Sequence, residues 1–299
     1  MNIQSKKEKG KEEWPIQSII PWVGGKQALC PTILQRFPPG FRNKIYVEVF
    51  GGGGSVLLNK ERSVREILND KNGNLINLFR VVRDHPNELK DRLLYVVHSR
   101  EDFQIAQRRL AEFSYKDDIL RAADFYQVIR QSYAGNGKQF CAVGRSMWAG
   151  FPIIDAVCGR LQYVVLENED FETILTRYDS PTTFFYLDPP YFDTEDYYPG
   201  KIFLPSDHRR LADLLFGAEG LWLLSYNLCP EVLELYQQPG IFIEQVERIN
   251  NMAQRYESGA MYQEVLISNY DTSKRTPEQL YLFAPEKQTE RKILWNGLY

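Results

Sequence analysis

The sequence is poor in the residues that build metal centres and disulfide frameworks. Its 299 residues include four cysteines and three histidines, both scattered along the chain without paired spacing. This distribution gives no sign of a zinc site or a disulfide scaffold, and free thiols are typical of a reducing compartment. No apolar run approaches the ~20 residues that span a bilayer. We therefore expect a cytoplasmic protein with no bound metal and no membrane segment.

The chain also lacks an overall basic charge. Its formal net charge is -3, so contact with nucleic acid would depend on a local patch. One window, Phe125 to Ile154, contains no acidic residue, and its cations alternate with aromatic residues around a glycine-rich turn from Ser132 to Lys138. Cations, aromatic rings and amides contact phosphates and base edges. An ordinary solvated loop is the alternative, but the missing acids favour nucleic acid. The candidate DNA-binding residues are Arg130, Tyr133, Asn136, Lys138 and Arg145.

What the sequence does contain is an alternation of strand and helix patterns, typical of an α/β fold. Strands are predicted at residues 45–50, 65–70, 161–167, 184–188, 221–226, 241–246 and 263–270. A polar segment without a helical stripe separates the last two strands, which predicts an antiparallel hairpin. The mostly helical stretch from Asn74 to Tyr163 is too long to be a loop, so we expect an inserted subdomain there.

The most informative stretch is the apolar run that ends in Asp188-Pro189-Pro190-Tyr191. The prolines cannot donate to a strand ladder, so the strand must stop, and ligands bind at this edge of α/β sheets. The Asp188 carboxylate and the Pro189 carbonyl could each accept one hydrogen of an adenine amino group. Tyr191 could then stack on a base that has left the helix. A plain Asp-Pro turn is the alternative, and the tetrapeptide alone does not decide.

A second informative stretch follows the first strand, where Gly51 to Gly54 lead into a helix. Strand, glycine turn and helix form the nucleotide-binding arrangement, because a ligand can lie against bare backbone. The pattern Phe50-x-Gly52-x-Gly54 is shorter than the dinucleotide fingerprint. Asp70 ends the next strand, near the ~20-residue spacing of a ribose-binding carboxylate. A flexible loop and a helix cap are the respective alternatives.

Two further stretches stay ambiguous. Trp22 and Lys26 flank a pair of glycines, which either let backbone approach a ligand or merely form a turn; the turn is favoured. Asp170 and Phe171 follow the third strand. They could hold the amino group and ring of a nucleoside, or Asp170 could simply cap a helix.

Together these stretches resemble the Dam-type (D12 class) adenine-specific DNA methyltransferases of the alpha-ordered amino-methyltransferase group. The resemblance is collinear from Ile19 to Tyr270, with the inserted segment least similar. It rests on Trp22-Val23-Gly24-Gly25-Lys26, Glu48-Val49-Phe50-Gly51-Gly52-Gly53-Gly54-Ser55-Val56, Ile67-Leu68-Asn69-Asp70, Asp188-Pro189-Pro190-Tyr191 and Leu224-Ser225-Tyr226-Asn227. Several short motifs in the same order are far more specific than any one of them.

The resemblance implies a Rossmann-like class I S-adenosylmethionine-dependent methyltransferase sheet of seven strands, the last one antiparallel, with an inserted, mainly helical target-recognition domain. The catalytic domain would comprise residues 14–80 and 160–285, and the recognition domain residues 81–159. Residues 1–13 would be a disordered tail and residues 286–299 a C-terminal tail. The implied cofactor-binding residues are Trp22, Lys26, Phe50, Gly52, Gly54, Asp70, Asp170, Phe171 and Asp188. The implied catalytic residues are Asp188, Pro189, Pro190 and Tyr191.

The implied reaction is site-specific methyl transfer from S-adenosyl-L-methionine to N6 of a flipped adenine in double-stranded DNA. The alternatives are cytosine N4 or RNA as acceptor, and a catalytically silent module that binds S-adenosylmethionine and DNA. A monomer is the default, and we expect a protein encoded by a bacterium, phage or mobile element. Whether a cognate restriction endonuclease is a partner is left open by the sequence. Val49 and Gly51 replace the family's usual proline and valine. Residues 141–145 do not match the recognition segment of the GATC enzymes, so the target sequence is not predicted.

Overall fold

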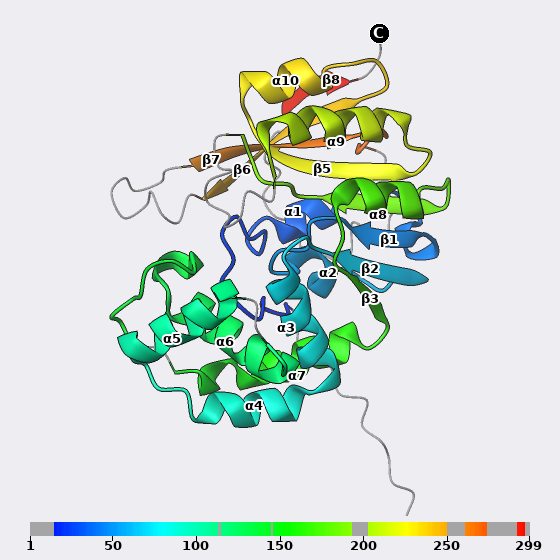
Figure 1. The fold of residues 1–299 in the computed structure, drawn as a ribbon. Helices are drawn as coiled ribbons and strands as arrows, with labels where there is room; N and C mark the ends of the chain where they lie inside the picture. The colour runs from blue at the N-terminus through cyan, green and yellow to red at the C-terminus, as the bar shows by residue number, and fades with distance from the viewer. Residues whose placement is uncertain are drawn as a thin grey trace, which may run out of the picture.

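The structure, a computed structural model, describes residues 15–112, 115–144, 146–192, 203–249, 261–273 and 292–296. Its centre is an eight-stranded mixed sheet in the order β3-β2-β1-β4-β5-β7-β6-β8 (Figure 1). The strands are β1 (Ile45–Glu48), β2 (Arg65–Asn69), β3 (Val164–Glu167), β4 (Thr183–Leu187), β5 (Leu221–Asn227), β6 (Phe242–Ile249), β7 (Met261–Ser268) and β8 (Lys292–Asn296). Strands β1 to β5 are parallel to one another, so their carboxyl ends meet at one edge.

Helices cover both faces of the sheet. The helices are α1 (Cys30–Leu34), α2 (Ser55–Asn59), α3 (Gly73–Asp84), α4 (Pro86–Leu94), α5 (Arg100–Glu112), α6 (Asp118–Gln131), α7 (Phe151–Leu161), α8 (Phe171–Tyr178), α9 (Pro205–Gly217) and α10 (Pro230–Tyr236). Every residue of β4 is buried, and its side chains alternate between two hydrophobic clusters. Because strand side chains alternate faces, α1 to α3 cover one face and α8 to α10 the other. The expected α/β class is therefore confirmed.

The antiparallel end of the sheet differs from expectation in one respect. The expected hairpin is present, since β7 pairs antiparallel with both β5 and β6. An eighth strand, β8, pairs antiparallel with β6 and lies within residues 286–299, which the sequence indicates only as tail. The sheet therefore has eight strands among the described residues, one more than the seven expected. Strand β8 is a short edge strand with charged neighbours, so its sequence shows little strand periodicity. Its pairing with β6 is what defines it as a strand.

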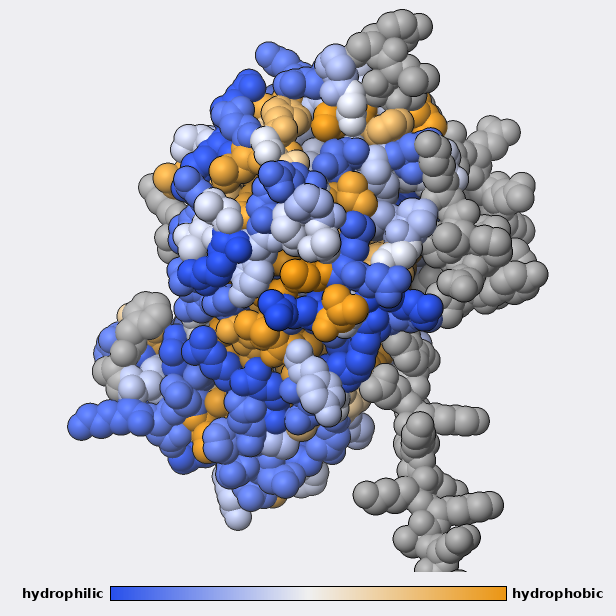
Figure 2. Space-filling model, turned by 90° about the vertical axis from the view of Figure 1, so that its right-hand side faces the viewer, coloured by the Kyte–Doolittle hydropathy of each residue, from blue (hydrophilic) through white to orange (hydrophobic). Residues whose placement is uncertain are grey.

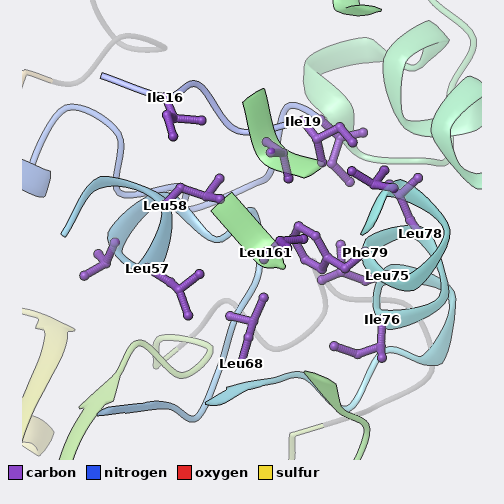
Figure 3. Packing of buried hydrophobic residues seen from close by; sticks show 14 of the residues in the cluster. Ile16, Ile19, Leu57, Leu58, Leu68, Leu75, Ile76, Leu78, Phe79 and Leu161 are labelled. Carbon is purple, nitrogen blue, oxygen red and sulfur yellow. The ribbon is translucent and has the colours of Figure 1, made fainter. Parts of the chain in front are cut away.

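The inserted segment folds into helices α3 to α7, as expected. Helix α3 packs against both α6 and α7 (Figure 1). One hydrophobic cluster runs from the sheet through α3 into α6 and α7, and Figure 3 shows part of it. Residues labelled there include Leu57, Leu58, Leu68, Leu75, Phe79 and Leu161. On the face in Figure 2, hydrophobic side chains gather across the middle, with mostly hydrophilic ones above and below. The expected domain boundary at residues 80/81 falls inside α3.

None of the helices among the described residues combines the length and the apolar character that a membrane span needs.

A buried ion cluster ties α7 to the sheet. Glu66 of β2 contacts Lys60 and accepts a 2.6 Å hydrogen bond from Arg160 of α7, and all three residues are almost fully buried. Arg160 also donates to the Leu57 carbonyl at 2.7 Å. Burial lowers the pKa of Lys60 to about 8, although Glu66 pulls it upward. Removing Arg160 leaves Lys60 as the buried cation beside the Glu66 carboxylate and takes the donor from the Leu57 carbonyl, which costs far more than losing a surface pair.

We therefore expect Arg160→Met to lower the free energy of unfolding by about 3–5 kcal/mol. Arg42→Met is the matched control, since its partner Glu61 lies at 2.7 Å but both side chains are substantially exposed. That change should cost only ~0–1 kcal/mol. Urea unfolding followed by circular dichroism measures both, and equal losses in the two variants would contradict this account.

Candidate active site

An open pocket lies where the parallel strands end. It has a volume of about 800 Å³, its mouth included, and is lined by the loop after β1, the ends of β2 and β4, and the Trp22–Lys26 turn. Seven of the nine expected cofactor residues line it: Trp22, Lys26, Phe50, Gly52, Asp70, Phe171 and Asp188. The sequence motifs that carry the resemblance thus converge on one place, although they are far apart in the chain.

The glycine loop gives this pocket a floor of bare backbone. Gly52 has φ +48°, a conformation that side chains other than glycine's rarely adopt. A Cβ on Gly52 would stand 2.8 Å from Nε1 of Trp22, so the indole lies directly on the loop. Gly54, in contrast, does not line the pocket: it begins α2, and its missing Cβ faces Leu58 and Phe79.

Asp70 is held at the pocket wall by backbone amides. Its carboxylate accepts hydrogen bonds from the amides of Gly52 at 2.9 Å and Asn72 at 2.8 Å. Burial raises the pKa of Asp70, and these two hydrogen bonds oppose the rise. The side chain that caps α3 is that of Asn72, which accepts from the amides of Asn74 and Leu75. Asp70 therefore lines the pocket instead of serving as the N-cap residue.

Asp170 is not among the residues that line the pocket. It caps α8, and its carboxylate pairs with Lys71 at 2.8 Å and Arg210 at 3.2 Å. Burial alone would raise the pKa of Asp170, but these cations and the cap hydrogen bond lower it. The neighbouring Glu169 lines the pocket instead. The cap alternative that the sequence leaves open is thus observed.

Three aromatic rings form one end of the pocket. The centroids of Phe50 and Phe171 are 5.7 Å apart, and Phe203 lies 5.8 Å from the first and 5.7 Å from the second. Sequence reasoning identified two of these rings. It missed Phe203, which stands just before α9 with no motif around it.

The Asp188 carboxylate also lines the pocket and is paired with a buried lysine. Nζ of Lys26 is 2.7 Å from Oδ1 of Asp188 and donates to the Gly24 carbonyl at 2.9 Å. Of the other expected catalytic residues, Pro190 lines the pocket, whereas Pro189 and Tyr191 do not. The Tyr191 ring lies 4.8 Å from Nζ of Lys26 and is almost fully buried.

Tyr191 and the following residue are anchored by groups that the sequence did not single out. The Tyr191 hydroxyl donates to Oε2 of Glu264 on β7 at 2.9 Å. Burial, with the nearby Asp188 and Glu264 carboxylates, raises the pKa of Tyr191 well above its ordinary value of 10.0. Phe192 stacks on His208 with centroids 3.6 Å apart. The His208 ring is buried and contacts the Tyr226 hydroxyl at 2.6 Å.

Glu48 is a further acid in the pocket that sequence reasoning did not assign. It ends β1, is buried, and accepts a 2.7 Å hydrogen bond from the Tyr46 hydroxyl. Burial raises the pKa of Glu48 from 4.5 to about 8, against the lowering effect of Tyr46. An acid inside an apolar strand was the available signal.

This shift predicts a pH-dependent stability. Between its ordinary pKa and about 8, Glu48 holds a proton in the folded protein that the unfolded chain releases, so folding stability falls as pH rises through this window. We expect Glu48→Gln, which carries no titrating proton, to flatten that fall. Urea unfolding of both proteins at about pH 5 and about pH 8 measures it. Parallel pH dependences would contradict the assignment.

The expected DNA-binding residues lie on and beside the turn after α6. Tyr133 and Lys138 are exposed, and Asn136 accepts from the amides of Lys138 and Gln139, which shapes the turn. The Arg130 guanidinium lies 5.3 Å from the Tyr126 ring centroid. Arg145 lies outside the described residues.

This turn reaches the rim of the pocket. A Cβ on Gly135 would stand 2.8 Å from the Pro21 carbonyl, next to Trp22. The Trp22 ring in turn contacts Phe125 of α6, with centroids 6.5 Å apart. The inserted helices and the pocket therefore share one wall.

Comparisons with known proteins agree with this geometry. A family described as D12 class N6 adenine-specific DNA methyltransferase matches residues 22–136 and 157–256. The chain is 27% identical over 250 residues to the DNA N-6-adenine-methyltransferase of Escherichia phage P1, which covers 76% of the chain and 32% of that protein. The chain therefore spans about a third of the length of the phage protein.

Two bacterial relatives are also similar. The type II methyltransferase M1.LlaDCHI of Lactococcus lactis subsp. cremoris is 24% identical over 287 residues, covering 87% of the chain and 98% of that protein. The DNA adenine methylase of Haemophilus influenzae is 36% identical over 81 residues, which is 27% of each chain.

Proposed function

Because the chain belongs to the D12 class of N6 adenine-specific DNA methyltransferases, we propose that it methylates adenine at N6 within a specific site of double-stranded DNA, with S-adenosyl-L-methionine as the donor. The observation that carries this proposal is that Asp188, Gly52 and Asp70 line one pocket. A carboxylate suited to an adenine amino group thereby shares a cavity with a loop suited to a nucleotide-like cofactor.

The types of residue that line the pocket, and their arrangement there, suit S-adenosylmethionine. The rings of Phe50, Phe171 and Phe203 would hold the adenine of the cofactor, and Asp70 would accept hydrogen bonds from its ribose. The backbone at Gly52 leaves room that a Cβ would fill, since Trp22 already stands over that position. When bound, the cofactor supplies an electrophilic methyl group on a sulfonium.

The target amino group would be handled by the end of β4. We place a flipped adenine against Pro190, with its amino hydrogens on the Asp188 carboxylate and the Pro189 carbonyl and its ring on Tyr191. Pro189 and Tyr191 do not line the pocket as it stands, so their contacts to the base require a local movement when DNA binds. Two acceptors localise the nitrogen lone pair, which otherwise delocalises into the ring. Asp188 need not remove a proton before the attack, because the nitrogen becomes acidic only once methylated. Positioning of the reactants supplies much of the rate.

The inserted helices would bind the duplex. The exposed Tyr133 and Lys138 and the acid-free segment around them supply groups for phosphate and base contact. Their turn adjoins Trp22, so DNA held there would lie at the mouth of the pocket. A monomeric state and a cognate restriction endonuclease stay predictions.

The direct test is to incubate the protein with tritiated S-adenosylmethionine and unmethylated genomic DNA, then digest the DNA to nucleosides. We expect label in N6-methyladenine, and mapping the modified positions gives the target sequence. Label in N4-methylcytosine, or in RNA alone, would overturn the assigned acceptor. Cofactor binding without label in any nucleic acid would identify a silent module.

A further inference from the structure

An acid on the antiparallel strand β7 reaches the same edge as the catalytic motif. Because β7 runs opposite to β5, its first residues lie where β5 ends, and Glu264 stands opposite Asn227. Glu264 is completely buried (0% exposed), and so are the three apolar residues that follow it. A carboxylate in such a place is costly unless other groups compensate it.

The compensating groups belong to the active site. Oε2 of Glu264 accepts the Tyr191 hydroxyl hydrogen at 2.9 Å and lies 4.0 Å from Nζ of Lys26. Lys26 pairs with Asp188 at 2.7 Å and lies 4.8 Å from the Tyr191 ring centroid. Glu264, Tyr191 and Lys26 thus contact one another, and Asp188 joins them through Lys26. Both ends of the Asp-Pro-Pro-Tyr motif are connected to one buried acid.

We infer that Glu264 is a positioning residue for methyl transfer, which fixes Tyr191 and Lys26 and thereby aims the Asp188 carboxylate. This inference rests on the proposed role of Asp188. The hydrogen bond to Glu264 fixes the end of the motif, and the negative charge keeps the Lys26 ammonium at the same point. Without these restraints the carboxylate shifts, and misplacement by about 1 Å costs about 100-fold in rate.

The test uses four variants of the full chain. Glu264→Gln removes the charge, Tyr191→Phe removes the donated hydrogen, and a third variant carries both changes. Glu244→Gln is the matched control, because Glu244 is a buried acid on the adjacent strand β6, paired with Arg36 at 2.9 Å. For each protein we would measure the single-turnover rate on unmethylated DNA, the dissociation constant of S-adenosylmethionine and the urea midpoint.

We expect Glu264→Gln and Tyr191→Phe each to lower the single-turnover rate by about 10-fold, the scale of one charge-assisted hydrogen bond. Binding of S-adenosylmethionine should change by less than about 3-fold. The double variant should be no more than about 3-fold slower than the slower single variant, because both changes break the same contact. Glu244→Gln should lower only the urea midpoint.

Three results would overturn the inference: a Glu264→Gln rate within about 2-fold of the unmodified protein, equal slowing in Glu244→Gln, or effects that simply multiply in the double variant. Asp188→Ala separates this failure from that of the proposed function. An inactive Asp188→Ala with a fully active Glu264→Gln would remove the positioning role alone. A fully active Asp188→Ala would remove the proposed mechanism itself.

Discussion

Replacing Asp188 by Ala is expected to lower the rate of methyl transfer on the order of 10³-fold or more while leaving measurable binding of S-adenosylmethionine. In the proposed mechanism this carboxylate accepts an amino hydrogen and draws the nitrogen toward a tetrahedral geometry. The aromatic end of the pocket and the Asp70 wall lie apart from it and stay intact. The effect should therefore appear in turnover, with a much smaller change in cofactor affinity.

The measurement is single-turnover transfer of tritium to unmethylated DNA, beside calorimetric titration of the cofactor. Asp84→Ala is a suitable control, because Asp84 ends α3 on the surface and pairs with its neighbour Arg83. Near-normal turnover in Asp188→Ala would contradict the proposed role of Asp188 in methyl transfer. Complete loss of cofactor binding in that variant would instead assign Asp188 to the cofactor site.

The second large effect is expected at Gly52, where an added methyl group should weaken S-adenosylmethionine binding by about 100-fold. In Gly52→Ala the new Cβ would stand 2.8 Å from Trp22 Nε1, at a φ of +48° that alanine adopts poorly. The loop or the indole must shift, and either shift alters the floor of the pocket.

Gly40→Ala provides the matched control for backbone strain. Gly40 has φ +72° with nothing within 4 Å of its Cβ position, so alanine there carries the strain without the collision. It should cost ~1 kcal/mol of stability and leave the cofactor dissociation constant unchanged. Equal loss of binding in both variants, measured by calorimetry, would show that strain and not the pocket floor is responsible.

The parts of the site that sequence reasoning located are those whose signals are local. Asp70 and Asp188 each terminate a strand, and Gly52 follows one. The carboxyl ends of parallel strands share an edge, so these residues had to meet. The rule needs no knowledge of long-range packing.

Sequence reasoning missed Glu264, Phe203 and Glu169, because other features of the fold bring these residues to the site. Glu264 reaches the edge near the start of an antiparallel strand, where the rule for carboxyl ends does not apply. Phe203 lies just before α9 in the sequence, twelve residues after Tyr191. Its place among the other rings depends on tertiary packing. Asp170 and Glu169 are adjacent in the sequence. Asp170 is the N-cap residue of α8, whereas the neighbouring Glu169 lines the pocket.

The hydrophobic cluster shared by the sheet and the inserted helices has a consequence for protein engineering. A chimera that exchanges all of residues 81–159 with a relative's segment would cut α3 in two and would also cut α7 just before Arg160. Such hybrids should fold poorly. The family match omits residues 137–156, which begin within the turn that adjoins Trp22. Exchange confined to residues 137–156 leaves α3, α6 and the second half of α7 native, so it is the smaller replacement with which to test the proposed target-recognition role.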